Sequence, residues 1–71
     1  LVGYYALYVR GEIDVVRPAD GSMQRLTAPS GYVYGNPIYV SATEAWAPLG
    51  AKGGSFGVAL LRLPLSAWPD L

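Results

Sequence analysis

Apolar residues recur at every second position in short runs along this chain, and no segment shows the 3.6-residue period of an amphipathic helix. Nine glycines and six prolines separate these runs, at the spacing of about eight to ten positions that is typical of β-sandwiches and barrels. The runs are rich in Tyr, Val, Ile and Leu, which suit a pleated, half-buried surface. We therefore expect an all-β fold, a small roll or partial jelly roll of about six or seven short antiparallel strands.

The length of 71 residues allows a single β domain over residues 1–71, and a small one. At this size the burial of apolar surface roughly balances the entropy that is lost when the chain is ordered. Cys and His are both absent, so neither a disulfide nor the usual zinc ligands are available to stabilise the fold. Since the chain also begins with Leu1 rather than Met, we expect a fragment of a longer protein, stabilised by a second copy or by the remainder of its parent chain.

The composition excludes several classes of protein. Hydrophobic residues make up 52% and charged residues 14%, with five basic and five acidic side chains, so no basic surface is available for nucleic acid. The longest uncharged run, residues 26–43, is interrupted by prolines and glycines and predicts no membrane span. Arg10 and Glu12 break up the apolar start, so no secretory signal is visible and we expect a cytoplasmic protein.

The predicted strands and turns follow the alternation and the turn residues. Pro18-Ala19-Asp20-Gly21 predicts a tight turn, while Gly11 predicts a bulge or bend after which the chain continues. Residues 47–55, with Pro48 and several glycines, are interpreted as a mobile loop, and residues 65–71 as an irregular tail that packs through Trp68. The last strand is the most continuously apolar, so we expect it to be central or buried on both faces. The predicted strands are residues 1–10, 12–17, 22–27, 32–34, 38–46 and 56–63.

Residues that could carry out catalysis are few. The serines have no histidine to activate them. Glu12 and Asp14 lie about 6.5–7 Å apart on one strand face, which is most simply a solvated face. Glu44 lies in an apolar strand near Trp46, where desolvation is expected to raise its pKa. We therefore predict a protein that is not an enzyme, with no catalytic residue, no metal site and no cofactor.

The aromatic residues suggest a binding site. Tyr and Trp offer a large apolar face with one polar group, which suits a pocket lining and equally a core or a protein interface. One hypothesis places Tyr5, Tyr34 and Trp46 at the mouth of the roll, stacked against a small molecule, with Arg10 or Arg62 orienting it. The alternative is that the aromatic side chains fill the core and cover the outer surface of the sheet.

Two segments carry a resemblance to a known family. Residues 7–16 (LYVRGEIDVV), followed by Asp20-Gly21, Leu26 and residues 30–34, look like the middle of a cupin-type β-roll. Residues 54–68 (GSFGVALLRLPLSAW) resemble the end of the N-terminal sensor domains of AraC-type transcription regulators. The resemblance implies a cupin-like roll that binds an effector, dimerises and passes a signal to DNA-binding helices outside this chain.

The chain departs from these families at informative positions. The turn that usually contains Gly-Asp has Gly31-Tyr32, and the absence of His restricts the resemblance to metal-free cupins. A likeness to cyclic-nucleotide-binding rolls fails because Gly35 is followed by Asn36 and no Arg occurs between Arg25 and Arg62. No cyclic nucleotide is therefore expected as a ligand.

Three functional hypotheses remain open at this point. The first is a non-catalytic sensing and dimerisation domain of a transcription regulator, which binds a small apolar or aromatic effector and does not itself contact nucleic acid. The second is a structural β module of an oligomeric assembly such as a capsid, tail or scaffold, in which exposed tyrosines form a subunit interface. The third is a metal-free, cupin-like isomerase that relies on Glu44.

Overall fold

The computed structural model describes residues 3–54 and 56–70, with the side chains of residues 56–58 outside that description. The chain forms a small β-roll of two antiparallel sheets, and the described residues contain no helix, so the all-β prediction is confirmed. Within the described residues, therefore, nothing helical is long and apolar enough to cross a membrane. The molecule is elongated, with principal extents of 40 × 18 × 17 Å. The strands are β1 (Tyr5–Val9), β2 (Glu12–Arg17), β3 (Ser22–Leu26), β4 (Tyr32–Tyr34), β5 (Tyr39–Val40), β6 (Glu44–Ala51) and β7 (Phe56–Pro64).

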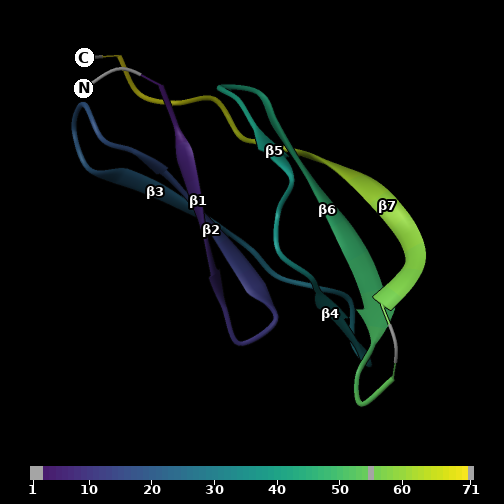
Figure 1. The fold of residues 1–71 in the computed structure, drawn as a ribbon. Helices are drawn as coiled ribbons and strands as arrows, with labels where there is room; N and C mark the ends of the chain where they lie inside the picture. The colour runs from purple at the N-terminus through teal and green to yellow at the C-terminus, as the bar shows by residue number, and fades with distance from the viewer. Residues whose placement is uncertain (1–2, 55, 71) are drawn as a thin grey trace.

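The first sheet has the strand order β1-β2-β3 and is made of two successive hairpins (Figure 1). Arg10 and Gly11 form the first turn, with φ angles of 51° and 82°. Two successive positive φ values are the geometry of a two-residue hairpin turn, which reverses the chain. The prediction of a bulge or bend at Gly11 was therefore wrong, because the strands on either side of Gly11 pair with each other.

The second turn agrees with its prediction. The Gly21 N–H donates to the Arg17 carbonyl (2.9 Å), and Gly21 has a φ of 75°. An Asp20 carboxylate oxygen accepts the Ser22 N–H (2.9 Å), as expected of an Asp in a turn. This turn brings β3 back alongside β2.

The second sheet is organised around β6. Strand β7 pairs along one edge of β6, while the short strands β4 and β5 pair with different parts of β6, at Leu49–Ala51 and at Ala45–Trp46. Figure 1 shows this sheet on the right and the first sheet on the left. The sheet differs from its prediction in three places.

The predicted strand over residues 38–46 is divided into two. A Ser41 hydroxyl accepts the N–H groups of Thr43 and Glu44 (3.3 Å each), and the Ser41 N–H donates to the Glu44 carbonyl (2.8 Å). These local bonds compete with an extended backbone and turn the chain sharply. Strand β5 therefore ends at Val40, and β6 begins at Glu44.

The predicted loop over residues 47–55 is largely strand, since β6 continues to Ala51. Pro48 is tolerated there because its carbonyl points away from β7 and accepts the Gly35 N–H (2.9 Å), just beyond the end of β4. The nitrogen of Pro48, which carries no hydrogen, points to the same side as its carbonyl. On that side the neighbouring strand is interrupted between β4 and β5, so no carbonyl there requires a donor from residue 48. Ser55, at the end of the predicted loop, lies outside the described residues.

Strand β7 is an edge strand rather than a central one. Its only partner among the described strands is β6, and Leu60 is 53% exposed. From Ala59 to Leu63 its side chains alternate between half-buried and exposed, the pattern of a strand covered on one face. A continuously apolar sequence was thus a misleading sign of burial here.

The core lies between the facing sides of the two sheets. Among the described side chains, five hydrophobic residues are buried there, of which only Ile13 and Val15 are large and fully inaccessible. A hydrogen bond from the Tyr34 N–H to the Gly11 carbonyl (2.9 Å) joins the first hairpin to β4. The buried hydrophobic residues are Ile13, Val15, Tyr34, Ala45 and Ala47.

The C-terminal tail closes one end of the roll. It leaves β7 and returns across the molecule, so that both chain ends lie on the same side in Figure 1. The Gln24 side-chain amide donates to the Ser66 carbonyl and accepts the Ser66 N–H (2.8 Å each), and Leu65 N–H donates to the Thr43 carbonyl (2.9 Å). The irregular tail packed by Trp68 is confirmed, except for Leu71, which lies outside the described residues, as do Leu1 and Val2 of the first predicted strand.

Candidate functional site

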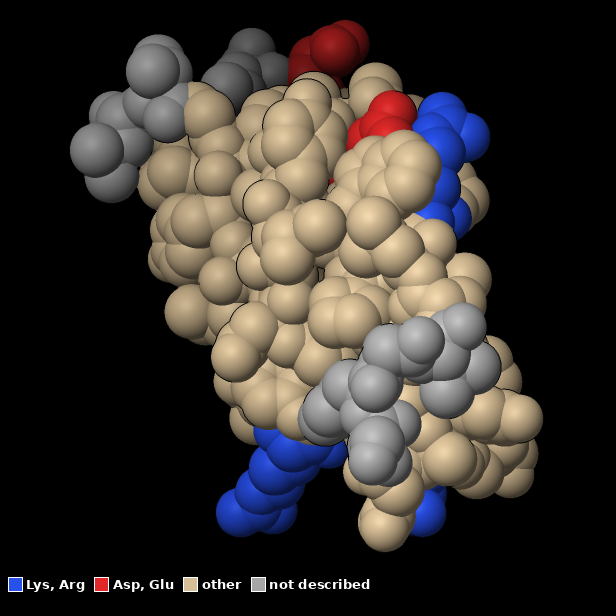
Figure 2. Space-filling view, turned by 45° about the vertical axis from the view of Figure 1, so that its right-hand side comes forward, with Lys and Arg blue, Asp and Glu red and all other residues tan. Residues whose placement is uncertain are grey.

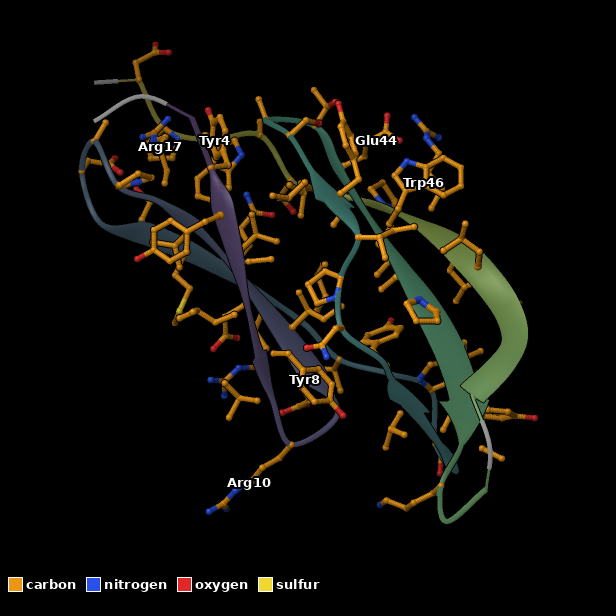
Figure 3. All side chains as sticks on the ribbon, viewed as in Figure 1. Tyr4, Tyr8, Arg10, Arg17, Glu44 and Trp46 are labelled. Carbon is orange, nitrogen blue, oxygen red and sulfur yellow. The ribbon has the colours of Figure 1, made fainter. Side chains whose placement is uncertain are left out.

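The four residues predicted to bind a ligand do not line one cavity. Tyr34 is 4% exposed in the core, where its hydroxyl donates to the Thr27 carbonyl (3.3 Å) and burial raises its pKa. Tyr5 is 46% exposed on β1. Figure 3 shows Trp46 on β6 and Arg10 in the first hairpin turn, far apart on different sheets.

Two open depressions in the described surface each contain one of the four residues. One, of about 250 Å³, is bordered by Arg10, Lys52 and the turn at Gly31. The other, of about 300 Å³, is a groove in which β1 faces β5, with Tyr5 and Tyr39 along it. The structure therefore places Tyr5 and Arg10 in separate depressions, and neither depression includes Tyr34 or Trp46.

The expectation that desolvation raises the pKa of Glu44 was wrong. The Arg62 guanidinium donates to the Glu44 carboxylate (3.0 Å), and the Trp46 indole N–H donates to the same oxygen. These donors stabilise the ionised carboxylate and lower its pKa, with the Arg62 bond the larger cause. Glu44 is thus held as an ionised partner of Arg62, which makes it a poor proton donor at neutral pH.

Glu12 and Asp14 also differ from a simple solvated face. Asp14 is 6% exposed, and both of its carboxylate oxygens accept bonds from the Arg25 guanidinium (2.8 and 3.1 Å). These bonds lower the pKa of Asp14. Among the described residues, no three acidic side chains lie close enough to share a metal ion.

Sequence reasoning missed the most connected group of side chains, which is centred on Arg17. Arg17 is 7% exposed, and its guanidinium donates to the Asp20 carboxylate and to the Pro69 carbonyl (2.7 Å). It also lies 5.4 Å from the ring centroid of Trp68, and that centroid lies 5.3 Å from the ring centroid of Tyr4. Figure 3 shows Arg17 and Tyr4 close together at one end of the first sheet. One sequence feature could have revealed this group: alternation places Arg17 on the inward face of β2, two residues after Val15.

Acid should weaken the fold through Asp20 and Asp14. The pKa of Asp20 is lowered well below its usual range, first by the bond from Arg17 and then by bonds from Ser22. A carboxyl with a lower pKa in the folded state stabilises the fold above its unfolded value, about 3.9 for Asp, and this stability is lost as the pH falls through the folded pKa. The urea midpoint should therefore stay constant from about pH 7 to 5 and fall between about pH 4 and 2.

Asp20→Asn tests this assignment. The variant should be less stable at neutral pH and should lose less of its urea midpoint on acidification, because Asn does not titrate. Far-UV circular dichroism in urea at a series of pH values provides the measurement. Parallel pH profiles for the wild type and Asp20→Asn would contradict the role given to this carboxylate.

Exposed apolar side chains are the dominant surface feature of the described residues. The large hydrophobic residues whose side chains are at least 40% exposed outnumber those that are buried in the core. Figure 2, with the β6–β7 side brought forward, shows a mostly uncharged face whose charged groups are gathered near its upper right and lower margins. The exposed residues are Tyr5, Leu7, Tyr8, Val9, Met23, Tyr32, Ile38, Tyr39 and Leu60.

Comparison of the chain with protein-family models, with curated proteins and with solved structures found no match.

Proposed function

We propose that this chain is an association module, whose task is to join copies of the protein that carries it. The observation that carries the proposal concerns the side chains that the structure describes: nine large hydrophobic ones are each at least 40% accessible, and five hydrophobic ones are buried in the core. Where such exposed apolar side chains gather into one patch on a small protein, the patch marks an interaction site.

The size and shape of the molecule support the proposal. A domain of this length buries only about 60% of the surface that its unfolded chain exposes, so its stability is marginal. The two sheets enclose a narrow core, with a molecular cross-section of 18 × 17 Å. Within the part of the chain that the structure describes, only Ile13 and Val15 are large, fully buried side chains. Covering the exposed apolar residues with a second copy would add the burial that the isolated chain lacks.

Charge supports association between identical copies. The five basic and five acidic residues give a formal net charge of zero, so two copies approach without long-range repulsion. Three of the cationic side chains are already paired with carboxylates: Arg17 with Asp20, Arg25 with Asp14, and Arg62 with Glu44.

Two of the functions expected from the sequence share this association. An AraC-like sensing domain dimerises, and a scaffold module assembles; they differ in whether a small molecule controls the process. The effector-binding role of Tyr5, Tyr34, Trp46 and Arg10 stays a prediction, as does the regulation of transcription. The dispersed positions of these four residues favour association as the function to test first.

The test is the dependence of stability on protein concentration. Because a partner that binds only the folded chain stabilises it by mass action, the urea midpoint of the 71-residue chain should rise as its concentration is raised from about 1 to 100 µM. Circular dichroism in cells of different path length measures this at constant absorbance. A midpoint that does not change over this range would contradict self-association.

A further inference from the structure

We propose that the outer face of the first sheet binds the same face of a second copy, so that two β1-β2-β3 sheets stack against each other. This inference rests on the proposed function and specifies its interface. The outer face is defined by the residues that the strand register places opposite the core side: Tyr5, Leu7, Val9, Glu12, Asp14, Val16, Met23 and Arg25.

Strand β1 is apolar on both faces, and the described chain covers part of the core-facing one, where Tyr8 is 40% exposed. Tyr4 and Ala6 pack against the core. Tyr5, Leu7 and Val9 point the other way and are 46%, 47% and 46% exposed. Apolar residues on both faces are typical of a strand that is covered on both sides. No described segment covers the face of β1 that carries Tyr5, Leu7 and Val9, so we infer that another molecule covers it.

The apolar surface extends beyond β1 in two directions. Tyr5, Val16 and Met23 form one row across the three strands, and Met23 is 54% exposed. On the other side, Tyr5 borders the groove with Ile38 and Tyr39, which are 66% and 54% exposed. The patch therefore runs from β3 across β2 to β1, and Ile38 adds to it at the groove beside β1.

The area of this patch approaches that of a stable dimer. Five side chains of roughly 150–200 Å² each, about half exposed, present on the order of 400 Å² of apolar surface. A standard interface buries about 800 Å² on each partner, of which about 60% is apolar. The five side chains are Tyr5, Leu7, Val9, Met23 and Ile38.

The charges on the outer face fit a second copy of the same face. Arg25, whose side chain is 56% exposed, and the partly exposed Glu12 lie at different positions on it. In a two-fold interface every contact between residue i and residue j occurs twice, so an Arg25–Glu12 contact between the copies would form in both directions. A partner of strongly basic or acidic character would find no matching field here, because the face carries both signs.

The second sheet presents a less continuous apolar face. Leu60 on β7 and Tyr39 on β5 are both exposed, but Trp46 and Pro48 of β6, between them, are half-buried. Leu60 is nevertheless as exposed as the residues of the outer face. It therefore provides a matched control for them.

The experiment compares Leu7→Lys with Leu60→Lys by sedimentation equilibrium of the full chain. Both variants replace a leucine on a strand, 47% exposed in one case and 53% in the other, with the same cation. Leu7→Lys should raise the dissociation constant of the dimer at least tenfold, whereas Leu60→Lys should change it less than twofold. An unchanged dimer in Leu7→Lys, or an equal loss in Leu60→Lys, would overturn the assignment of the face while leaving self-association intact. A wild-type chain that is monomeric at every concentration would overturn both proposals.

If Leu7→Lys fails to fold, a thiol-protection measurement on cysteine variants still locates the interface. The chain has no cysteine, so Leu7→Cys and Leu60→Cys each introduce a single thiol. The Leu7→Cys thiol should react with a maleimide more slowly as protein concentration is raised, in proportion to the dimer fraction. The Leu60→Cys thiol should react at one rate throughout. Concentration-independent labelling of Leu7→Cys in a sample that sediments as a dimer would place the interface elsewhere.

Discussion

Gly11→Ala should destabilise the chain by about 3 kcal/mol, which is enough to leave a large fraction unfolded at room temperature. Gly11 has a φ of 82°, a conformation that costs an L-residue about 1–2 kcal/mol. A methyl group at this position would also lie 2.7 and 2.8 Å from the Cγ1 and Cβ atoms of Val33. Because the neighbouring Tyr34 N–H donates to the Gly11 carbonyl, the hairpin turn cannot retreat without breaking the bond that joins it to β4.

Gly21→Ala separates the two causes. Gly21 has a similar φ of 75°, but an added methyl group would have no atom within 4 Å. Its cost should be limited to about 1–2 kcal/mol of backbone strain. Urea denaturation followed by far-UV circular dichroism compares the two variants. Equal losses in Gly11→Ala and Gly21→Ala would show that the close packing of the first hairpin against β4 is absent in solution.

Trp68→Ala should lower the free energy of unfolding by about 2–3 kcal/mol, somewhat below the 3–5 kcal/mol typical of a fully buried aromatic residue. Trp68 is half-buried, stacks with Tyr4 and Arg17, and donates its indole N–H to the Ala42 carbonyl (2.8 Å). Its removal deprives the tail of its main anchor between the two sheets. The remaining Trp46 provides a fluorescence signal for the urea titration.

Trp68→Phe is the matched control. It keeps an aromatic ring beside Tyr4 but removes the bond to Ala42 and part of the indole's packing, so the loss should be about 1–1.5 kcal/mol, smaller than that of Trp68→Ala. Trp68→Ala should also speed the hydrogen exchange of the Ser66 and Leu65 amides, which the Gln24 side chain and the Thr43 carbonyl protect. A loss below about 0.5 kcal/mol in Trp68→Ala, with both amides still protected, would show that the tail is held without its tryptophan.

The first sheet could be predicted from the sequence because its signals are local. Alternation placed Ile13 and Val15 inward on β2, and Pro18–Gly21 contains residues that each favour a turn for a physical reason. The turn at Gly11 was missed because a glycine between two strands is equally compatible with a bulge. Only the positive φ of Arg10, a residue that rarely adopts it, distinguishes the hairpin.

The second sheet was harder to predict because its decisive interactions are non-local. A proline such as Pro48 normally predicts the end of a strand. Strand β6 accommodates it because the strand beside it is interrupted between β4 and β5. The apolar character of β7 does not reveal whether a second strand lies beside it. For the candidate site, Tyr5 and Tyr34 were predicted together at the mouth of the roll, because residue type alone does not distinguish the exposed outer face of β1 from the core position of Tyr34.

Sedimentation equilibrium of the wild-type chain tests the central claim most directly. The apparent mass should rise from 7.6 kDa in dilute solution toward twice that value at about 100 µM, because the uncovered apolar face of the first sheet takes up a second copy. A folded chain that sediments at 7.6 kDa over the whole concentration range would contradict the account.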